Sequence, residues 1–325
     1  MSEKLLEVKD LRTYFTTIKG EIKAVDGVSF YVNRGESLGL VGESGCGKTT
    51  TALSITKLLP EEGYINSGQI IFDGKDITHM DERGLNHLRW KEVSMIFQGA
   101  MNALNPVQRV CDQIVEPILL HEKVTKKEAM ERVKELFDLV EIDANLMYSY
   151  PHEFSGGMRQ RAIIAMALAC NPKLIIGDEP TTALDVMVQA QILDLINDLR
   201  RKFHMSMIMI THDLSIITET CDRIAIMYAG KIVEMGSTEE VLLNYLHPYT
   251  EKLVNAFPNI YKERKMVDSI PGVPPDLYDP PIGCRFAPRC HKRIDNICDN
   301  QEPYLIDYKG NNHYVACHLR RSYNG

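Results

Sequence analysis

The stretch Gly42-Glu43-Ser44-Gly45-Cys46-Gly47-Lys48-Thr49-Thr50 has the spacing of a phosphate-binding loop. It follows the short apolar run 37–41 and precedes a helical pattern of apolar residues, so a strand, a glycine-rich turn and a helix come in the required order. The glycines let successive backbone N–H groups point at one spot, where the positive end of the following helix also favours an anion. We expect Lys48 to reach the β- and γ-phosphates of a nucleotide and the Thr49 hydroxyl to bind magnesium. The complete G-x-x-x-x-G-K-T spacing argues against the alternative, a tight strand-to-helix turn with a chance Lys-Thr.

The composition is that of an ordinary globular protein. At 325 residues the chain is long enough for two domains, or for one large domain with an appendage, and its hydrophobic fraction of 44% provides a sizeable core. The net charge of −7 argues against a nucleic-acid-binding protein, which would normally carry a basic surface. The longest apolar run, 162–170, is too short to cross a bilayer, so we expect the protein to meet any membrane through partners. Four scattered cysteines suit free thiols in a reducing cytoplasm: Cys46, Cys111, Cys170 and Cys221.

Polar side chains follow predicted strands at their carboxyl ends, the edge at which open α/β sheets bind ligands. The strands are 93–97, 174–177 and 207–210. Gln98 is placed to hold a magnesium-bound or attacking water, and Asp178 to bind magnesium or its waters. Glu179 is placed to polarise a water for attack on the γ-phosphate, and His212 to contact that phosphate. Taken singly, Gln98 would more often be an ordinary loop residue and His212 a structural histidine.

The region from about 99 to 168 has the pattern of a helical insert in an otherwise α/β chain. Thr125-x-x-Glu128 is a capping box, and it opens a helix with one apolar stripe of Ala129, Val133, Leu136, Phe137 and Val140. Ser155 is placed as the N-cap of a later helix, where Gly156 and Gly157 leave a second anion-binding end accessible. Capping without any ligand is the alternative for a Ser-Gly-Gly taken alone. Asp185 opens a further amphipathic helix.

An aromatic pair, Tyr14-Phe15, lies between two predicted strands, 5–8 and 22–32, upstream of the phosphate loop. Either ring has a flat face that can stack on a nucleotide base. From the residues alone, a core aromatic at a strand end is an equally good interpretation.

Together these stretches resemble the ATP-binding subunits of ABC transporters over roughly the first three-quarters of the chain. The resemblance rests on the Walker A loop 42–50, the Gln98 loop, the signature 155–157, the Walker B end 178–179, the D-loop Ala183-Leu184-Asp185 and the switch residue His212. It implies a RecA-like P-loop NTPase core with an antiparallel β subdomain and a helical subdomain at about 99–168, within a domain spanning 1–245. It also implies a head-to-tail pair of ATPase domains, in which the signature of one closes over ATP held by the other.

The family's roles transfer to matching residues of this chain. Catalysis is implied for Glu179, His212 and Gln98, and magnesium binding for Thr49, Gln98 and Asp178. ATP binding is implied for Phe15, Tyr14, Gly42, Ser44, Gly45, Cys46, Gly47, Lys48, Thr49, Thr50, Ser155, Gly156, Gly157 and Asp185. For stacking on adenine, Phe15 aligns best, with Tyr14 close behind.

Three further stretches look like the dipeptide/oligopeptide importer branch: 151–161, 247–249 and the proline-rich 271–281. The branch implies an ATPase on the cytoplasmic face of the cell membrane, paired with a second copy or a similar ATPase. Its other partners are two permease subunits and, through them, an external peptide-binding protein. One departure is Gly99-Ala100, where the branch more often has an acidic residue and a proline. Nickel or oligosaccharide as the solute therefore stays open, as does, less favoured, a non-transport ABC ATPase.

The tail, 246–325, contains four cysteines: Cys284, Cys290, Cys298 and Cys317. Their spacing matches neither the close pairs of structural zinc sites nor a common ferredoxin pattern, and disulfides do not suit a cytoplasmic protein. Spacing alone leaves the metal open. The stretch 283–290 resembles the tail of peptide-importer ATPases, some of which hold a 4Fe–4S cluster. The resemblance implies that cluster, with zinc as the alternative, as a staple for a tail too small to bury its own core.

Overall fold

The computed structural model describes residues 3–99, 103–182, 184–256 and 270–320. The chain folds into two compact units, each assembled from several segments. The first unit comprises Met1–Leu5, Val32–Ser37 and Asp73–Ile210, and the second comprises Leu6–Tyr31, Leu38–Phe72 and Thr211–Gly325. The predicted domain boundaries, 1–245 and 246–325, stay a prediction.

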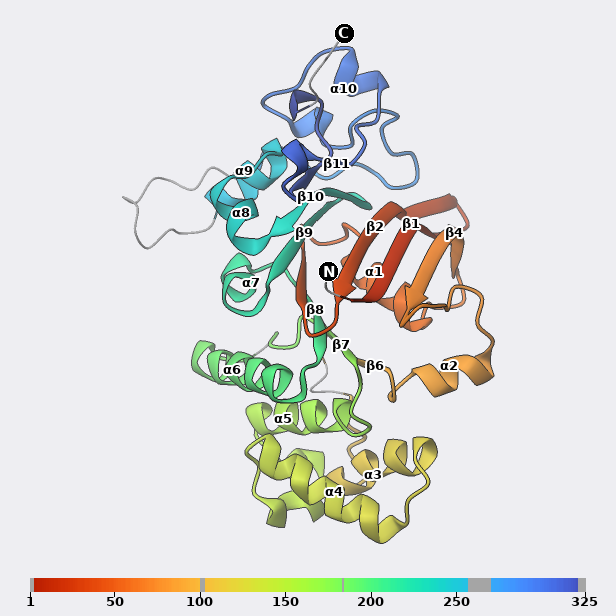
Figure 1. Cartoon of the computed structure of the whole chain (residues 1–325), viewed down its shortest axis with the longest axis vertical. Helices are drawn as coiled ribbons and strands as arrows, with labels where there is room; N and C mark the ends of the chain where they lie inside the picture. Colours follow the sequence, from red (N-terminus) through yellow and green to blue (C-terminus); the bar gives the residue numbers. More distant parts are fainter. Residues whose placement is uncertain (1–2, 100–102, 183, 257–269, 321–325) are drawn as a thin grey trace. The chain divides into compact units, whose positions relative to one another are not determined.

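The first unit is built on a parallel sheet with the strand order β8-β7-β6. Its strands are β6 (Val93–Ile96), β7 (Leu174–Asp178) and β8 (Ser206–Thr211), whose last residue already belongs to the second unit. Every residue of β7 and β8 is buried, as expected for a parallel sheet covered on both faces. Helix α5 (Gly156–Ala167) packs against β6 and against α6 (Val186–Phe203), as Figure 1 shows.

Helices α3 (Val110–His121), α4 (Lys126–Leu139) and α5 pack together as the helical region of the first unit (Figure 1). The predicted capping box is confirmed: the Thr125 N–H donates to Glu128 Oε2 at 2.7 Å, and the Glu128 N–H donates to Thr125 Oγ1 at 3.3 Å. The predicted apolar stripe on α4 is also confirmed, since all its members are buried. The smaller elements of this unit are β5 (Lys75–Asp76), α2 (Glu82–Leu88), and the 3₁₀ turns η2 (Ala144–Tyr148) and η3 (Pro151–Glu153).

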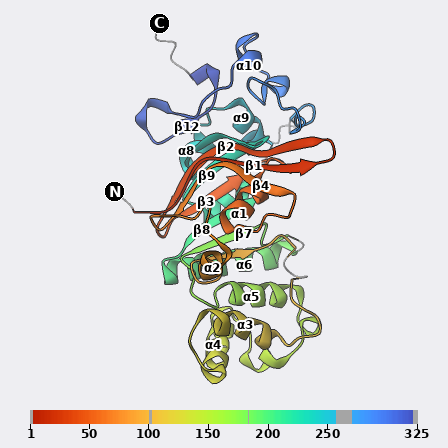
Figure 2. The same ribbon diagram turned by 90° about the vertical axis from the view of Figure 1, so that its right-hand side faces the viewer.

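An antiparallel sheet in the second unit has the order β2-β1-β4, formed by β1 (Lys4–Thr17), β2 (Gly20–Asn33) and β4 (Gly63–Phe72). The strands β1 and β2 form the long pair in Figure 2. Strand β1 is longer than the predicted 5–8. Its pairing with β4 shifts register between Lys9 and Thr13, and this irregularity interrupts the alternation by which a strand is predicted from sequence. The aromatic pair 14–15 therefore lies inside a strand and not in a connection.

A second sheet in this unit has the order β11-β12-β10-β9-β3. Strand β3 (Ser37–Val41) runs parallel to β9 (Arg223–Tyr228), and β9 runs antiparallel to β10 (Lys231–Ser237). The tail adds two short strands, β12 (Tyr314–Val315) against β10 and β11 (Ile306–Asp307) against β12. The helices of the unit are α1 (Lys48–Thr56), α7 (Leu214–Thr220), α8 (Thr238–Leu243), α9 (Pro248–Asn255) and α10 (Ile297–Asn300), with the 3₁₀ turns η4 (Ala287–Arg289), η5 (Tyr308–Gly310) and η6 (His318–Arg320).

The described tail is thus mostly loop and short turns, but it pairs with the edge of a sheet. The predicted α/β class, with an antiparallel sheet and a helical region, is present. Within the described ranges, no helix is long and apolar enough to cross a membrane.

Candidate functional site

The phosphate loop lies in the second unit, between the fully buried strand β3 and helix α1. Gly45 and Gly47 have φ of 77° and 104°, in the left-handed region that favours glycine. A Cβ on Gly47 would stand 2.3 Å from the Ala24 carbonyl oxygen, and one on Gly42 would stand 2.1 Å from the Met227 carbonyl oxygen. Close backbone approach therefore requires glycine at both positions. Helix α1 begins at Lys48 directly after this turn, as predicted.

The Lys48 ammonium lies against the loop itself. It donates to the carbonyl oxygens of Gly42 at 2.7 Å and Glu43 at 3.0 Å, and it lies 3.7 Å from Cys46 Sγ. Three other members of the predicted ATP-binding set, Ser44, Gly45 and Thr49, are exposed, whereas Cys46 and Gly47 are buried and Thr50 is half-buried. The loop thus offers its middle and the Thr49 hydroxyl to solvent.

The aromatic pair divides between two roles. Tyr14 is 8% exposed, and its hydroxyl donates to Asp26 Oδ1 at 3.0 Å, so both its ring and its polar tip are committed to the core. Phe15 is half-buried and pairs with Gly63 across β1 and β4. Phe15 is thus the less buried of the two rings, and which of them stacks on adenine stays a prediction.

Three predicted residues of the first unit lie at the carboxyl end of the parallel sheet. Asp178 ends β7 and is 2% exposed. The Gln98 side-chain amide donates to Glu179 Oε2 at 2.8 Å, and the Thr182 hydroxyl donates to the same oxygen at 3.1 Å. Glu179 also has a φ of 47°, which is uncommon for a non-glycine residue and fits a functional position. The structure thus brings Gln98 and Glu179 together, although they are 81 positions apart in the sequence.

Ser155 is the N-cap of α5, as predicted, and its hydroxyl accepts from the Met158 N–H at 3.2 Å. Gly157 follows in the first turn, where a Cβ would meet Val188 Cγ1 at 2.9 Å. Asp185 is the N-cap of α6 and accepts from the Val188 N–H at 3.0 Å. The D-loop residue Ala183 and the residue Ala100 after Gly99 lie outside the described residues.

His212 is exposed at the start of the second unit, directly after β8. Asp213, the next residue, is the N-cap of α7 and accepts from the Ser215 N–H at 2.8 Å. The structure therefore keeps His212 at a strand end, as the sequence predicts.

The four tail cysteines gather in one region of the second unit. The Cys284 N–H donates to the Cys298 carbonyl at 2.8 Å. Burial, together with the neighbouring thiols of Cys298, Cys317 and Cys290, raises the pKa of Cys284 to about 12. All four are free thiols. Among the described residues, however, no three His, Cys, Asp or Glu side chains are arranged to hold a metal ion, so the structure gives the predicted cluster and the zinc alternative no direct support.

Two arginines of the tail bind residues of the second unit that lie outside the tail. The sequence did not predict either contact. The Arg285 guanidinium donates to the carboxylate of Asp26. The same carboxylate also accepts hydrogen bonds from the Arg12 guanidinium and the Tyr14 hydroxyl. Arg289 makes a two-pronged contact with Glu43 in the phosphate loop. The only signal in the sequence was that each arginine adjoins a cysteine, and this names no partner.

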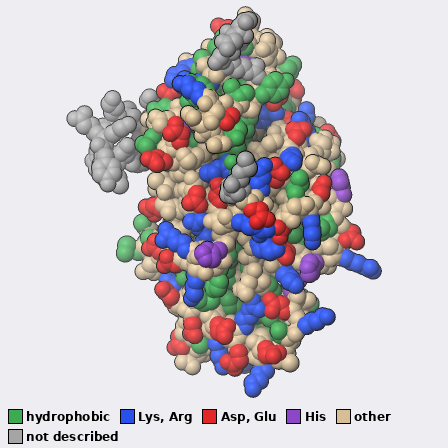
Figure 3. Space-filling model, viewed as in Figure 1, with side chains coloured by type: hydrophobic (Ala, Val, Ile, Leu, Met, Phe, Trp, Pro, Cys, Tyr) green, Lys and Arg blue, Asp and Glu red, His purple; other side chains and the backbone are tan. Residues whose placement is uncertain are grey.

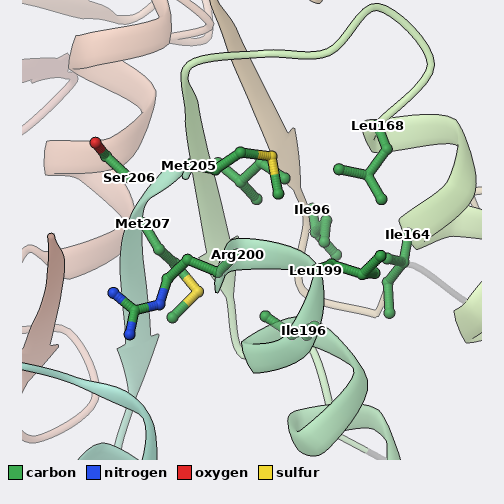
Figure 4. A pocket seen from close by; sticks show the side chains of 10 residues that line it. Ile96, Ile164, Leu168, Ile196, Leu199, Arg200, Met205, Ser206 and Met207 are labelled. Carbon is green, nitrogen blue, oxygen red and sulfur yellow. The ribbon is translucent and has the colours of Figure 1, made fainter. Parts of the chain in front are cut away.

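An apolar hollow in the first unit, shown in Figure 4, is not a nucleotide site. Its lining comes from α5, α6 and the parallel sheet, and includes Ile96, Ile164, Leu199 and Met207. The Arg200 side chain extends away from Leu168 and Ile164 in this view, and its guanidinium donates to the Gly35 carbonyl at 2.9 Å. Ser206 also lines the hollow, but its hydroxyl donates to the Asn33 carbonyl at 3.0 Å, so the polar groups of both Arg200 and Ser206 are engaged with backbone carbonyls.

Comparison with known proteins agrees with this geometry. The family model described as ABC transporter matches residues 25–182, and the one described as oligopeptide/dipeptide transporter, C-terminal region, matches residues 233–298. The chain is 48% identical over 320 residues to the oligopeptide transport ATP-binding protein OppD of Bacillus subtilis, covering 97% of this chain and 89% of the relative. The chain belongs to the peptide-transport family of ABC transporter ATP-binding proteins.

Two further likenesses bear this out. The dipeptide transport ATP-binding protein DppD of Bacillus subtilis is 44% identical over 98% of this chain and 95% of its own length. The dimeric structure of MJ0796, a bacterial ABC transporter cassette, matches with a TM-score of 0.64 and 25% identity over 72% of this chain and 98% of that chain. The predicted fold, a P-loop NTPase cassette, is confirmed, and ATP hydrolysis in the service of peptide transport is the activity of this family.

Proposed function

We propose that this chain is the ATP-hydrolysing subunit of an importer of short peptides. The observation that carries the proposal is the placement of Glu179: it follows a buried aspartate at a strand end, and two side chains, Gln98 and Thr182, hold its carboxylate. A carboxylate held in this way can orient a water molecule and take its proton during attack on a γ-phosphate. The peptide-transporter model that matches the C-terminal part supports the substrate class.

In this proposal the phosphate loop and the strand-end residues take the roles that the family resemblance implies. The N–H groups of residues 44–49 cradle the phosphates, Lys48 leaves its loop carbonyls to reach them, and Phe15 stacks on the base. Thr49 in the second unit, and Gln98 and Asp178 in the first, carry the oxygen atoms that magnesium prefers, and magnesium when bound neutralises phosphate charge. His212 contacts the γ-phosphate and reports its loss.

The working form in this proposal is a head-to-tail pair, made of two copies or of this chain and a similar ATPase. The signature residues Ser155, Gly156 and Gly157 of one subunit close over ATP held by the other. Asp185, in the D-loop motif, also belongs to the proposed ATP-binding set. The dimeric cassette to which this chain is similar supports the pairing. Closure is passed to two membrane permease subunits, which place the protein on the cytoplasmic face of the membrane, and an external binding protein delivers the peptide.

The surface supports a role that needs no nucleic acid. Acidic and basic side chains are interspersed on the face shown in Figure 3, without a continuous basic area. The net charge of −7 likewise argues against binding to a phosphate backbone.

The pairing is tested by introducing Ser44→Cys and Ser155→Cys, both at exposed positions. Mild oxidation with ATP and magnesium should join two subunits through these cysteines, and the join should be lost without nucleotide. The matched control carries Ser155→Cys alone. A failure to crosslink in the presence of ATP, in a variant that still binds it, would refute the head-to-tail arrangement.

The solute is tested in cells that depend on this importer. Replacing Glu179 with glutamine should abolish uptake of labelled di- and tripeptides and leave uptake of free amino acids by other systems intact. Continued peptide uptake, or loss of nickel or oligosaccharide uptake in its place, would contradict the peptide assignment.

A 4Fe–4S cluster on Cys284, Cys290, Cys298 and Cys317 is also part of the proposal, with zinc as the alternative. Four gathered free thiols are the ligand type that such clusters use, and a four-iron cluster is larger than a single ion, so its thiolates stand further apart. Bound there, it would crosslink a tail that has little core of its own. Anaerobic purification should give brown protein with about four irons per chain. Colourless protein with stoichiometric zinc would refute the cluster.

A further inference from the structure

Arg289 in the tail holds Glu43 in the phosphate loop. Its Nη1 donates to Glu43 Oε2 at 2.7 Å, and its Nη2 donates to Glu43 Oε1 at 3.0 Å. This is the parallel, two-pronged geometry that makes arginine–carboxylate pairs strong and directional. The contact joins residues 246 positions apart, both within the second unit.

The rest of the Arg289 side chain is fixed by its surroundings. Its Nε donates to the Pro271 carbonyl at 2.8 Å, and its Nη1 also donates to the Tyr228 hydroxyl at 3.2 Å. The side chain is 5% exposed, compared with 26% for Glu43. Burial alone would lower the pKa of Arg289, but its hydrogen bonds to Glu43 and Tyr228 raise it overall, so the guanidinium keeps its charge.

Glu43 lies where its charge matters. Its carbonyl accepts from Lys48, and its N–H donates to the Tyr249 hydroxyl at 3.0 Å. A small cavity beside it is lined both by the loop, 43–46, and by the tail residues Pro274, Pro275 and Leu277. The loop must accept a polyanion, and a carboxylate within it repels phosphate unless a cation compensates its charge.

We infer that Arg289 is a positioning residue for ATP binding, which neutralises Glu43 and fixes the shape of the phosphate loop from the tail. The inference rests on the proposed role of that loop and deepens it. It gives the tail a direct part in nucleotide affinity that requires no metal.

The test measures displacement of a fluorescent nucleotide from the full chain by ATP, ADP and AMP. In Arg289→Gln the unpaired Glu43 carboxylate should raise the Kd for ATP about tenfold. The rise should be smaller for ADP and smallest for AMP, because the repulsion grows with phosphate charge. The turnover number at saturating ATP should change much less than the KM, since Arg289 is proposed to act on ATP binding through Glu43 and has no proposed part in the chemical step.

Removing the charge should rescue the defect. The double variant Glu43→Gln/Arg289→Gln has no unpaired carboxylate, so its ATP affinity should return to within about threefold of wild type. Arg289→Lys keeps the charge without the two-pronged contact and should give a Kd between those of wild type and Arg289→Gln.

Arg285→Gln is the matched control. Arg285 is also a buried tail arginine in an ion pair, but its partner Asp26 keeps Arg12 and Lys231 as cations. Loosening of the tail in this variant should weaken ATP and AMP by the same factor. If the loss of nucleotide affinity grows with the number of phosphates in Arg289→Gln but not in Arg285→Gln, the loss is due to the charge of Glu43.

Two results would overturn the inference: an equal loss of affinity for ATP and AMP in Arg289→Gln, or no recovery in the double variant. If Arg289→Gln does not fold, Arg289→Lys carries the test, and an equal change for the three nucleotides then overturns it. Failure of the wild-type chain to bind ATP, or unchanged binding after Lys48→Ala, would instead refute the proposed function of the loop.

Discussion

Replacing Phe286 with alanine should release the segment 270–320 from the rest of the second unit. Phe286 is 1% exposed, and its ring centroid lies 5.2 Å from that of Tyr228 and 5.4 Å from that of Tyr249, both in edge-to-face geometry. The His247 ring lies 5.7 Å away. These partners belong to β9, α9 and the N-cap of α9, so one phenylalanine joins the segment 270–320 to two elements of the second unit.

The magnitude follows from this packing. Truncating a buried phenylalanine to alanine costs about 3–5 kcal/mol, and each well-oriented aromatic pair adds about 0.5–1.5 kcal/mol beyond area burial. Leucine at the same position keeps most of the volume and should cost less than about 1.5 kcal/mol. We therefore expect alanine to raise the population with a detached tail by about a thousandfold and leucine by about tenfold.

The assay is cleavage by trypsin at Arg285 and Arg289, which are 6% and 8% exposed and so protected while the tail is docked. At low protease concentration the cleavage rate follows the equilibrium population of the open form. Fragments are quantified by mass spectrometry for the wild type and both variants. Cleavage of the alanine variant within about threefold of the leucine variant would show that the aromatic cluster does not hold the tail.

Further predictions concern catalysis, nucleotide binding and pH. Glu179→Gln should lower ATP turnover at least about 100-fold, while ATP still binds and closed dimers accumulate on size exclusion. The control Glu135→Gln, at an exposed position, should behave as wild type. Wild-type turnover in Glu179→Gln would show that Glu179 is not the general base. Lys48→Ala should weaken ATP binding at least about tenfold by direct titration, and an unchanged Kd would exclude its phosphate role. Burial lowers the pKa of His247 from 6.5 to about 3. The contribution of neutral His247 to the free energy of unfolding should therefore be complete above pH 6.5, and the free energy should fall by about 1.4 kcal/mol per pH unit as the pH decreases from 6.5 towards 3. His247→Asn keeps an N-cap acceptor for the Tyr249 N–H and should flatten that slope in urea titrations; an unchanged slope would assign it to other groups.

Local patterns in the sequence were sufficient for the phosphate loop and for the helix starts. The turn at Gly47, the cap at Ser155 and the capping box at Thr125 each involve groups within four positions of one another, so the chain specifies them without a partner. The strand-end positions of Asp178 and His212 were likewise predictable, because an apolar run led directly into each.

Other features required the tertiary structure. The burial of Tyr14 depends on the fold of β1 and β2, which brings its hydroxyl to Asp26. The full length of β1 was hidden because a shift in register interrupts its alternation. The gathering of the tail cysteines, and the absence among described residues of a group arranged to hold a metal ion, also depend on how the loops fold.

The sequence by itself determined the family and the chemistry of the phosphate loop, because both are encoded by residues that are near neighbours along the chain. Only the tertiary structure decided that Arg289 pairs with Glu43 and that the tail strand β12 pairs with β10. The reason is physical: such contacts join segments far apart in sequence, and their energy depends on a geometry that no local pattern specifies.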